Sequence, residues 1–183
     1  SPNSPEWVLM EYACALSGLV LVTANPAFQT RELAYVLEQS GAVALFLVEE
    51  FRGNPMSLIG AEVAESIASV REVTDMETAA LYAEGFRSPA LSRETPGNAA
   101  MIQYTSGTTG FPKGAVLSHR GLVNNARFYA SRCRVTEATT WVNIMPMFHT
   151  SGCGMVTLGC LQAGCRMVLV SLFDPDEVLD QLE

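Results

Sequence analysis

The chain has 183 residues, of which 49% are hydrophobic and 16% are charged, and its formal charge is −8. This composition predicts one globular domain with a buried core and leaves little room for a second domain. The negative charge argues against a nucleic-acid surface, which needs clustered Lys and Arg, and no apolar run reaches the roughly 18 residues of a transmembrane helix.

The first part of the chain, residues 1–74, alternates apolar runs of strand length with segments of helical period. Such alternation is typical of βα units on a parallel sheet. We predict helices over residues 7–17 and 55–69, a further helix that begins at Thr30 and ends at Gly41, and strands over residues 19–23, 42–48 and 71–74. Thr30 is expected to cap its helix, and Gly41 suits the left-handed position that follows a helix.

The alternation is lost in residues 75–98, which are predicted to form an irregular connector ending at Thr-Pro-Gly-Asn. In residues 99–183 we predict strands over 99–104, 115–117, 139–145 and 165–170, with helices after Ser118, over 150–163 and after Asp174. The helix after Ser118 is expected to bury a stripe of four residues, Leu122, Ala126, Tyr129 and Cys133. The predicted fold class is therefore α/β, with layers of mostly parallel sheet flanked by helices.

None of the five cysteines belongs to a C-x-x-C pair: Cys14, Cys133, Cys153, Cys160 and Cys165. Because only His119 and His149 could supplement them as ligands, a zinc site is not expected. An odd number of cysteines in a chain of this size suits a reducing compartment, where buried cysteine behaves as a small hydrophobic residue. We therefore predict a cytoplasmic location.

The segment from Tyr104 to Gly114, YTSGTTGFPKG, combines Ser and Thr hydroxyls, glycines and one lysine. Glycine lets backbone N–H groups approach an anion closely, hydroxyls add donors, and Lys113 adds a positive charge. These residues suit a polyphosphate, although an ordinary polar hairpin between two strands would also explain them. The segment is not the P-loop of NTPases, because Pro112 stands where the second glycine is required and Gly114 follows the lysine in place of Ser or Thr.

The same segment resembles the phosphate-binding signature of the adenylate-forming superfamily, which includes acyl-CoA synthetases, beetle luciferases and nonribosomal peptide adenylation domains. Four further strings support the likeness in order and spacing: PNSPEW, NPAFQTRELAYVLEQSGA, GAVLSHRGL and MPMFHTSG. The resemblance covers nearly the whole chain except residues 72–94, and it is closest to the acyl-CoA and fatty-acid CoA ligases. It implies that residues 1–183 are an internal part of the large N-terminal domain of such an enzyme.

This resemblance implies a reaction in two steps. A carboxylate attacks the α-phosphate of Mg-ATP, pyrophosphate leaves, and the thiol of CoA then takes the acyl group from the acyl-adenylate. ATP, Mg²⁺ and CoA are thus the implied cofactors, and the partner is a small carboxylic acid. Two alternatives stay open: a non-catalytic nucleotide-binding module, and an adenylating domain whose second step uses a carrier protein or, as in luciferases, oxygen.

The resemblance also assigns roles to individual residues. Lys113 and Thr108 are the implied catalytic residues, which stabilise the departing pyrophosphate, and Thr105 is the implied contact to magnesium. His149 and Gly152 are implied to contact the acyl substrate. His149 lies where a predicted strand ends, the usual place for ligand groups in open α/β sheets, although a core or capping role is the alternative. Phosphate binding is assigned to seven residues, Thr105, Ser106, Gly107, Thr108, Thr109, Gly110 and Lys113.

Several signatures of the superfamily, including its acidic magnesium ligand, its ribose-binding aspartate and its catalytic lysine domain, do not occur in these 183 residues. We therefore expect this chain alone to be inactive. Interfaces that the rest of the enzyme would cover should expose apolar surface, so we also expect the chain to self-associate. Neither the acid that is activated nor the native oligomeric state follows from the sequence.

Overall fold

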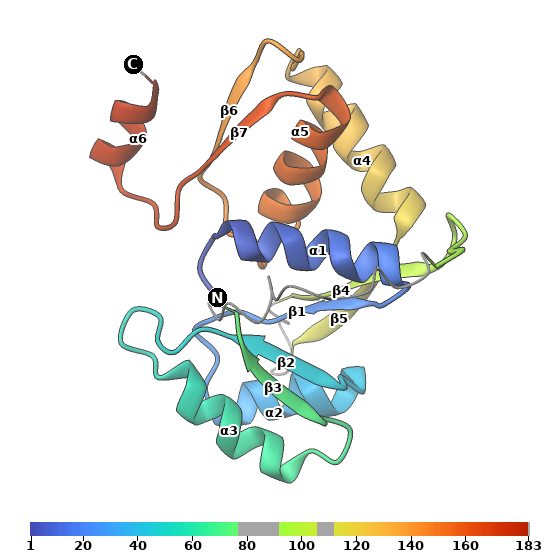
Figure 1. Cartoon of the computed structure of the whole chain (residues 1–183), viewed down its shortest axis with the longest axis vertical. Helices are drawn as coiled ribbons and strands as arrows, with labels where there is room; N and C mark the ends of the chain where they lie inside the picture. The colour runs from blue at the N-terminus through green and yellow to red at the C-terminus, as the bar shows by residue number, and fades with distance from the viewer. Residues whose placement is uncertain (77–91, 106–111, 183) are drawn as a thin grey trace, which may run out of the picture.

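The computed structural model describes residues 1–76, 92–105 and 112–182, and its architecture is mixed α/β (Figure 1). Most of the predicted connector, residues 75–98, lies outside these ranges. Within residues 1–76 the chain forms α1 (Pro5–Ser17), β1 (Leu21–Thr23), α2 (Thr30–Ser40), β2 (Ala44–Leu47), α3 (Met56–Ser66) and β3 (Glu72–Asp75). β2 pairs in parallel with β3 across the crossover helix α3, as the alternating pattern predicts.

Local capping explains where the first two helices begin and end. Ser4 accepts a hydrogen bond from the N–H of Trp7 at 3.3 Å and so begins α1. The predicted cap Thr30 is wrong, because the cap position of α2 is Gln29, whose backbone N–H donates to the carboxylate of Glu32 at 3.1 Å. Gly41 ends α2 with φ of 65°, which confirms its predicted left-handed conformation.

The second part of the chain supplies the central strand of the molecule. It forms β4 (Ala99–Thr105), β5 (Lys113–Ser118), α4 (His119–Arg132), β6 (Thr140–Asn143), η2 (Ser151–Thr157), α5 (Leu158–Ala163), β7 (Arg166–Leu169) and α6 (Pro175–Leu182). β4 is parallel to β1 and antiparallel to β5, in a sheet of order β1-β4-β5, while β6 pairs in parallel with β7. The described strands thus form three small sheets. Their strands pair in parallel except for β4 and β5, which are antiparallel.

Helix α4 begins as predicted but buries a different stripe. Ser118 accepts a hydrogen bond from the N–H of Gly121 at 3.2 Å, which confirms it as the cap. The residues that α4 buries are Leu122, Ala126 and Ala130, spaced four apart. Tyr129 is 39% exposed and stacks on the ring of Trp141 at 5.8 Å, and Cys133 is exposed after the last turn. The predicted burial of Tyr129 and Cys133 is therefore wrong, because Tyr129 lies at the edge of the stripe and packs on Trp141, and Cys133 lies past the end of the helix.

The predicted helix over residues 150–163 begins with a wider turn than an α-helix has. In η2, a π-helix, the N–H of Met155 donates to the carbonyl of Thr150, five residues earlier, at 2.8 Å. The chain then continues as the α-helix α5. Such wide turns occur frequently at functional sites, and this one directly follows His149.

The sheet β1-β4-β5 lies in the middle of the molecule, with α1, α4 and α5 on one side and α2 and α3 on the other (Figure 1). The main core joins α1, β4, α4 and η2 through buried residues that include Trp7, Met101, Leu122 and Cys153. A second cluster fills the space between α2 and α3. No helix in the described ranges is long and apolar enough to cross a membrane.

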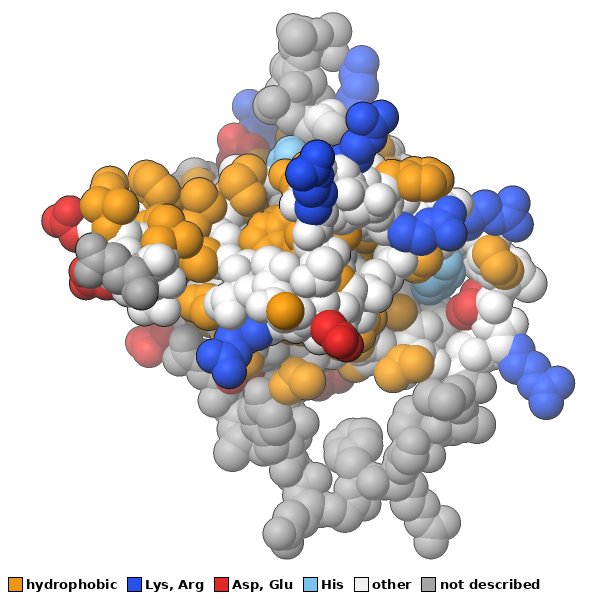
Figure 2. Space-filling view, turned by 90° about the horizontal axis from the view of Figure 1, so that it is seen from above, with side chains coloured by type: hydrophobic (Ala, Val, Ile, Leu, Met, Phe, Trp, Pro, Cys, Tyr) orange, Lys and Arg blue, Asp and Glu red, His pale blue; other side chains and the backbone are white. Residues whose placement is uncertain are grey.

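Apolar side chains are also exposed in places. Helix α6 has no buried residue, and its Leu179 and Leu182 are 60% and 66% exposed. Seen from above in Figure 2, hydrophobic side chains gather at the left, on the side where Figure 1 places α6. Exposed apolar surface of this kind is what the predicted self-association requires, although the association itself stays a prediction.

Candidate functional site

The hairpin β4–β5 brings the two ends of the predicted phosphate loop together. Thr105, the last residue of β4, lies directly opposite Lys113, the first residue of β5. The Thr105 hydroxyl approaches the carbonyl oxygen of Lys113 at 3.5 Å, and both side chains are exposed. The predicted phosphate ligands between them lie outside the described residues, so their role stays a prediction: Ser106, Gly107, Thr108, Thr109 and Gly110.

The opposite face of the hairpin is anchored by Tyr104. Its hydroxyl donates to the carbonyl of Val36 in α2 at 3.4 Å, and burial raises the pKa of this phenol, which keeps it protonated as a donor. A Cβ on Gly114 would lie 3.2 Å from the Tyr104 ring and 3.1 Å from Ile102. The absence of a side chain at Gly114 therefore lets the tyrosine ring lie close against β5 and hold the base of the loop.

Gln103 connects the hairpin to the turn that carries His149. Its Nε2 donates to the carbonyl of Phe148 at 3.0 Å, and its Oε1 accepts from the N–H of Thr150 at 3.1 Å. Because side chains alternate along a strand, Gln103 and Thr105 point to the same face of β4. The structure thus places the predicted substrate residue and the start of the phosphate loop on one face of the sheet. Gln103 is not among the predicted site residues, although a single amide within the apolar strand AAMIQYT is a usable sequence signal.

Two buried asparagines fix the rest of this turn. Asn3 donates to the carbonyls of Met145 (2.9 Å) and Val170 (3.0 Å) and accepts from the N–H of Met147 at 2.7 Å. Asn143 accepts from the N–H of Met145 at 3.2 Å. The backbone of the turn is therefore held from β4, from the end of β6 and from the segment before α1, which makes it a rigid support.

His149 is exposed and its ring is oriented by its neighbour. Nδ1 accepts a hydrogen bond from the N–H of Ser151 at 3.2 Å and lies 2.9 Å from the Ser151 hydroxyl. In the uncharged imidazole the proton therefore resides on Nε2, which can donate to a ligand. This arrangement suits a binding role better than a role as general base, because the accepting nitrogen is already in use.

Gly152 is completely enclosed by protein. A Cβ at this position would collide with the carbonyl oxygen of Pro146 and would lie 2.7 Å from that of Met145. Close packing of η2 on the preceding turn thus explains this glycine without any ligand. Its predicted contact with an acyl substrate stays a prediction.

A carboxyl group that the sequence analysis did not single out lies behind the turn. Glu11 of α1 is 6% exposed, and neither carboxylate oxygen has a hydrogen-bond partner among the described residues. Burial raises the pKa of Glu11 from 4.5 to about 8. Burial, and secondly the charge of Glu11, raise the pKa of the Cys153 thiol so far that it is a poor nucleophile.

The described residues contain no group of three His, Cys, Asp or Glu side chains that could hold a metal ion. Magnesium is usually held by one or two carboxylates together with phosphate oxygens and water. The exposed hydroxyl of Thr105 is an oxygen ligand of the right kind, so it fits a Mg²⁺ ion whose other ligands come from ATP, water and other parts of the protein.

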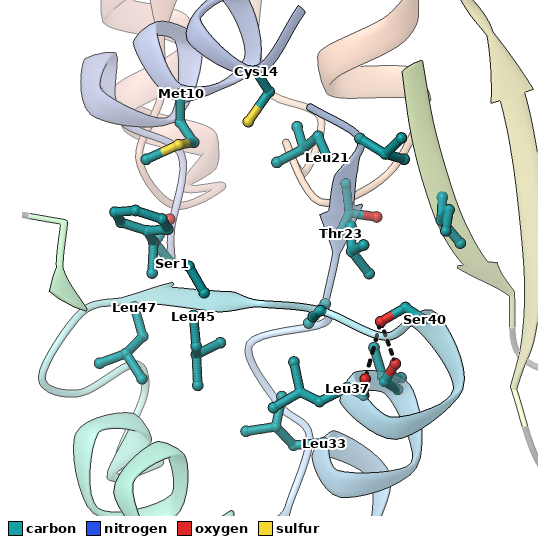
Figure 3. Close-up of a pocket in the computed structure, with 18 of the residues that line it drawn as sticks. Ser1, Met10, Cys14, Leu21, Thr23, Leu33, Leu37, Ser40, Leu45 and Leu47 are labelled. Carbon is teal, nitrogen blue, oxygen red and sulfur yellow. Dashed lines mark hydrogen bonds between the residues drawn. The ribbon is translucent and has the colours of Figure 1, made fainter. Parts of the chain in front are cut away.

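An apolar cavity of about 460 Å³ lies between α1, β1, β2 and α2 (Figure 3), and neither Thr105 nor Lys113 lines it. Met10, Leu21, Leu33 and Leu45 contribute to its wall, and none of its described lining residues has a charged side chain. At its edge the Ser40 hydroxyl donates back to the carbonyl of Val36 at 2.7 Å. With no Lys or Arg side chain in its wall, this cavity does not suit a polyphosphate.

Comparison with known proteins gives the same family throughout. The AMP-binding enzyme family matches residues 1–183. The human mitochondrial medium-chain acyl-CoA ligase ACSF2 is 30% identical over 99% of this chain and 35% of its own length. MatB from Rhodopseudomonas palustris, solved with ATP bound, aligns with a TM-score of 0.86 and 25% identity over 100% of this chain and 36% of its own. The o-succinylbenzoate CoA synthetase MenE from Bacillus subtilis, solved with the acyl-adenylate OSB-AMP, aligns with a TM-score of 0.83 and 27% identity. This alignment covers 99% of this chain and 44% of MenE.

The chain therefore spans about a third of the length of the curated relatives it matches. The alignments confirm the predicted α/β fold, which is that of the N-terminal domain of acyl-CoA synthetase-type enzymes. They also confirm the resemblance that the loop from Tyr104 to Gly114 suggests. With the match extending over all 183 residues, this chain belongs to the AMP-binding enzyme family.

Proposed function

We propose that the protein of which this chain is part activates a carboxylic acid with ATP and then transfers the acyl group to CoA. The support is family membership, together with relatives that are named as acyl-CoA ligases or that were solved with ATP or an acyl-adenylate. CoA is the acceptor we favour, because ACSF2 and MenE are both named for that product. A carrier-protein thiol or oxygen is the alternative acceptor.

The observation that carries this proposal is the pairing of Thr105 with Lys113 at the mouth of the hairpin. In the proposed first step a carboxylate oxygen of the acid attacks the α-phosphorus of ATP. The bond to the bridging oxygen breaks, and its electron pair leaves with pyrophosphate. Lys113 lies at the end of the loop and would stabilise the charge that grows on this leaving group. No general base is needed, because the nucleophile is already a carboxylate.

Magnesium, when bound, would neutralise part of the phosphate charge, and the Thr105 hydroxyl is the contact that this chain would offer. Hydroxyls and N–H groups of residues 106–110 would donate to the β- and γ-phosphates. A charge-assisted hydrogen bond of this type is worth about 1.5–3 kcal/mol, which matters in a chain whose formal charge is −8.

On the acid side of the site, we propose that His149 contacts the acyl substrate through its Nε2–H. The rigid turn around it would hold that donor on the same face of β4 as the start of the loop. Gly152, packed directly behind, would support the turn by letting η2 lie close against it, and a contact of its backbone with the acyl substrate is part of the same proposal. The cytoplasmic location stays a prediction, and the named mitochondrial relative makes it a question for direct measurement.

The proposal is tested by ATP–pyrophosphate exchange with the full-length protein across a panel of carboxylic acids, followed by thioester formation after CoA is added. Replacing Lys113→Ala should slow exchange by about 10²–10³ and weaken ATP binding much less, because the charge it stabilises develops in the transition state. The matched control is Arg71→Ala, which removes an exposed cation directly before β3.

Four results separate the possibilities. Unchanged exchange in Lys113→Ala contradicts the role of this lysine. ATP binding without exchange for any acid favours the non-catalytic module. Exchange without thioester formation from CoA favours a different acceptor. No affinity for ATP in the presence of Mg²⁺ would remove the proposed function altogether.

A further inference from the structure

The end of helix α5 brings two cysteines together. Gly164 ends the helix with φ of 66°, and its N–H donates to the carbonyl of Leu161 at 3.3 Å. The N–H of Cys165 donates to the carbonyl of Cys160 at 3.1 Å. These two bonds define a Schellman motif, in which the residue after the glycine and the residue five positions earlier place their side chains in contact. Here both of those residues are cysteines.

The separation of the two residues suits a disulfide. Summing the 3.1 Å hydrogen bond and the covalent bonds on either side limits the distance between the Cα atoms of Cys160 and Cys165 to roughly 7 Å, and bond angles shorten it further. Disulfides join Cα atoms that are about 4.4–6.8 Å apart. Both thiols are free, so the pair is in the reduced state.

The two thiols also differ in their surroundings. Cys160 is 4% exposed, whereas Cys165 is half-buried at the start of the chain segment that leads into β7. Burial raises the pKa of Cys160 to about 12, and the neighbouring Cys165 thiol adds to this through a hydrogen bond and its charge. The side chains thus interact directly, and Cys165 is the one that an oxidant can reach.

We propose that Cys160 and Cys165 form a redox-sensitive dithiol that closes to a disulfide when the protein meets a peroxide. Cys165 loses its proton to solvent and attacks one oxygen of hydrogen peroxide as the thiolate, so the O–O bond breaks and a sulfenic acid and hydroxide are formed, and the hydroxide takes up a proton to become water. The sulfur of Cys160 then attacks the sulfur of Cys165, its proton leaves with the hydroxyl group, and a second water is released. Two thiols and one peroxide thereby give one disulfide and two waters.

Closure would tie the last turn of α5 to the residue that precedes β7. α5 packs against α4 and continues directly from η2, so the bond would stiffen the layer above α1 (Figure 1). The pair lies at the end of α5 that is farther along the chain from the turn that carries His149, so we expect oxidation to change stability and leave nucleotide binding alone. The other three cysteines do not share a helix end with a second thiol in the described structure: Cys14, Cys133 and Cys153.

The test is peroxide treatment of the folded protein, alkylation of the remaining thiols, and mass analysis of the tryptic peptide 135–166, which contains Cys153, Cys160 and Cys165. We expect this peptide to lose two hydrogen atoms and to be alkylated at Cys153 alone, with full recovery after reduction. Cys160→Ser should instead leave a sulfenic acid at Cys165 that a dimedone probe traps. Cys133→Ser, at an exposed cysteine outside the pair, is the matched control and should not change closure.

Several results would overturn the proposal. Alkylation of all three cysteines after peroxide treatment would do so, and so would a bond from Cys165 to Cys133 or Cys153. Equal rates of closure in the native and the urea-unfolded chain would show that the helix end does not hold the thiols together. Because the wild-type peptide map is decisive by itself, a serine variant that fails to fold does not decide the outcome.

Discussion

The buried carboxyl of Glu11 should make the free energy of unfolding of this chain decrease as pH rises. Its two oxygens have no partner in the described structure, and burial raises its pKa from 4.5 to about 8. The uncharged form is therefore the one that the folded chain accommodates. Replacing Glu11→Gln keeps the shape of the side chain and removes its titration.

The sign and the size follow from proton binding. Between pH 4.5 and about 8 the folded chain holds a proton on Glu11 that the unfolded chain has released, so the free energy of unfolding decreases as pH rises. This contribution to stability is fully present below pH 4.5 and is lost as pH rises through about 8. Each pH unit in the window is worth about 1.4 kcal/mol, so going from pH 5 to pH 7 should lower the free energy of unfolding by roughly 3 kcal/mol.

Urea unfolding of the wild-type chain and of Glu11→Gln at pH 5, 6, 7 and 8 measures this slope directly. In Glu11→Gln, the free energy of unfolding should no longer show the decrease with pH that Glu11 causes. The variant should also be more stable than the wild type at pH 8. Glu65→Gln is the matched control, because Glu65 is exposed on helix α3 and its replacement should leave the slope unchanged. If Glu11→Gln folds and shows the same slope as the wild type, the argument from burial is wrong.

Three further predictions concern the turn around His149 and the exposed surface. Gly152→Ala should destabilise the chain by about 1–3 kcal/mol in urea unfolding, because its Cβ collides with the Pro146 carbonyl, whereas Gly97→Ala, whose Cβ meets nothing within 4 Å, should not. Gln103→Met should leave a carbonyl and an N–H of the turn unpaired and slow ATP–pyrophosphate exchange of the full-length protein roughly tenfold, and an unchanged rate would contradict the positioning role. Light scattering of this chain should show a mass that grows with concentration, and a clean monomer at high concentration would contradict self-association.

Much of the fold could be predicted because its signals are local. Strand-length apolar runs and helical periods depend on neighbouring residues, and they located the described helices and strands to within a few residues. The errors are also local in origin. Thr30 is a good cap by residue type, but the side chain of Glu32 reaches back to Gln29 and moves the cap by one residue. Tyr129 fits an apolar stripe by its position, but in the structure its ring stacks on the ring of Trp141.

In the candidate site, too, the residues that could be predicted are those whose signal is local. Thr105 and Lys113 belong to one continuous string, so the sequence could identify them together. The partners of Asn3 and Gln103 could not be predicted, because each lies far along the chain: Asn3 bonds to Val170, and Gln103 bonds to Phe148. A polar residue in an apolar strand indicates that some buried partner exists, but its identity depends on how the layers pack.

These amides matter because hydrophobic contacts alone would not fix the turn relative to the hairpin. Apolar packing has no preferred direction and tolerates small displacements, whereas a buried amide that is shifted loses a hydrogen bond without gaining one from water. Gln103 lies two residues before Thr105, so the same short stretch of β4 determines where the loop begins and where His149 is held. A displacement of the turn must therefore either break these bonds or move the strand that presents the loop, which is why the positions of the two candidate contacts are linked.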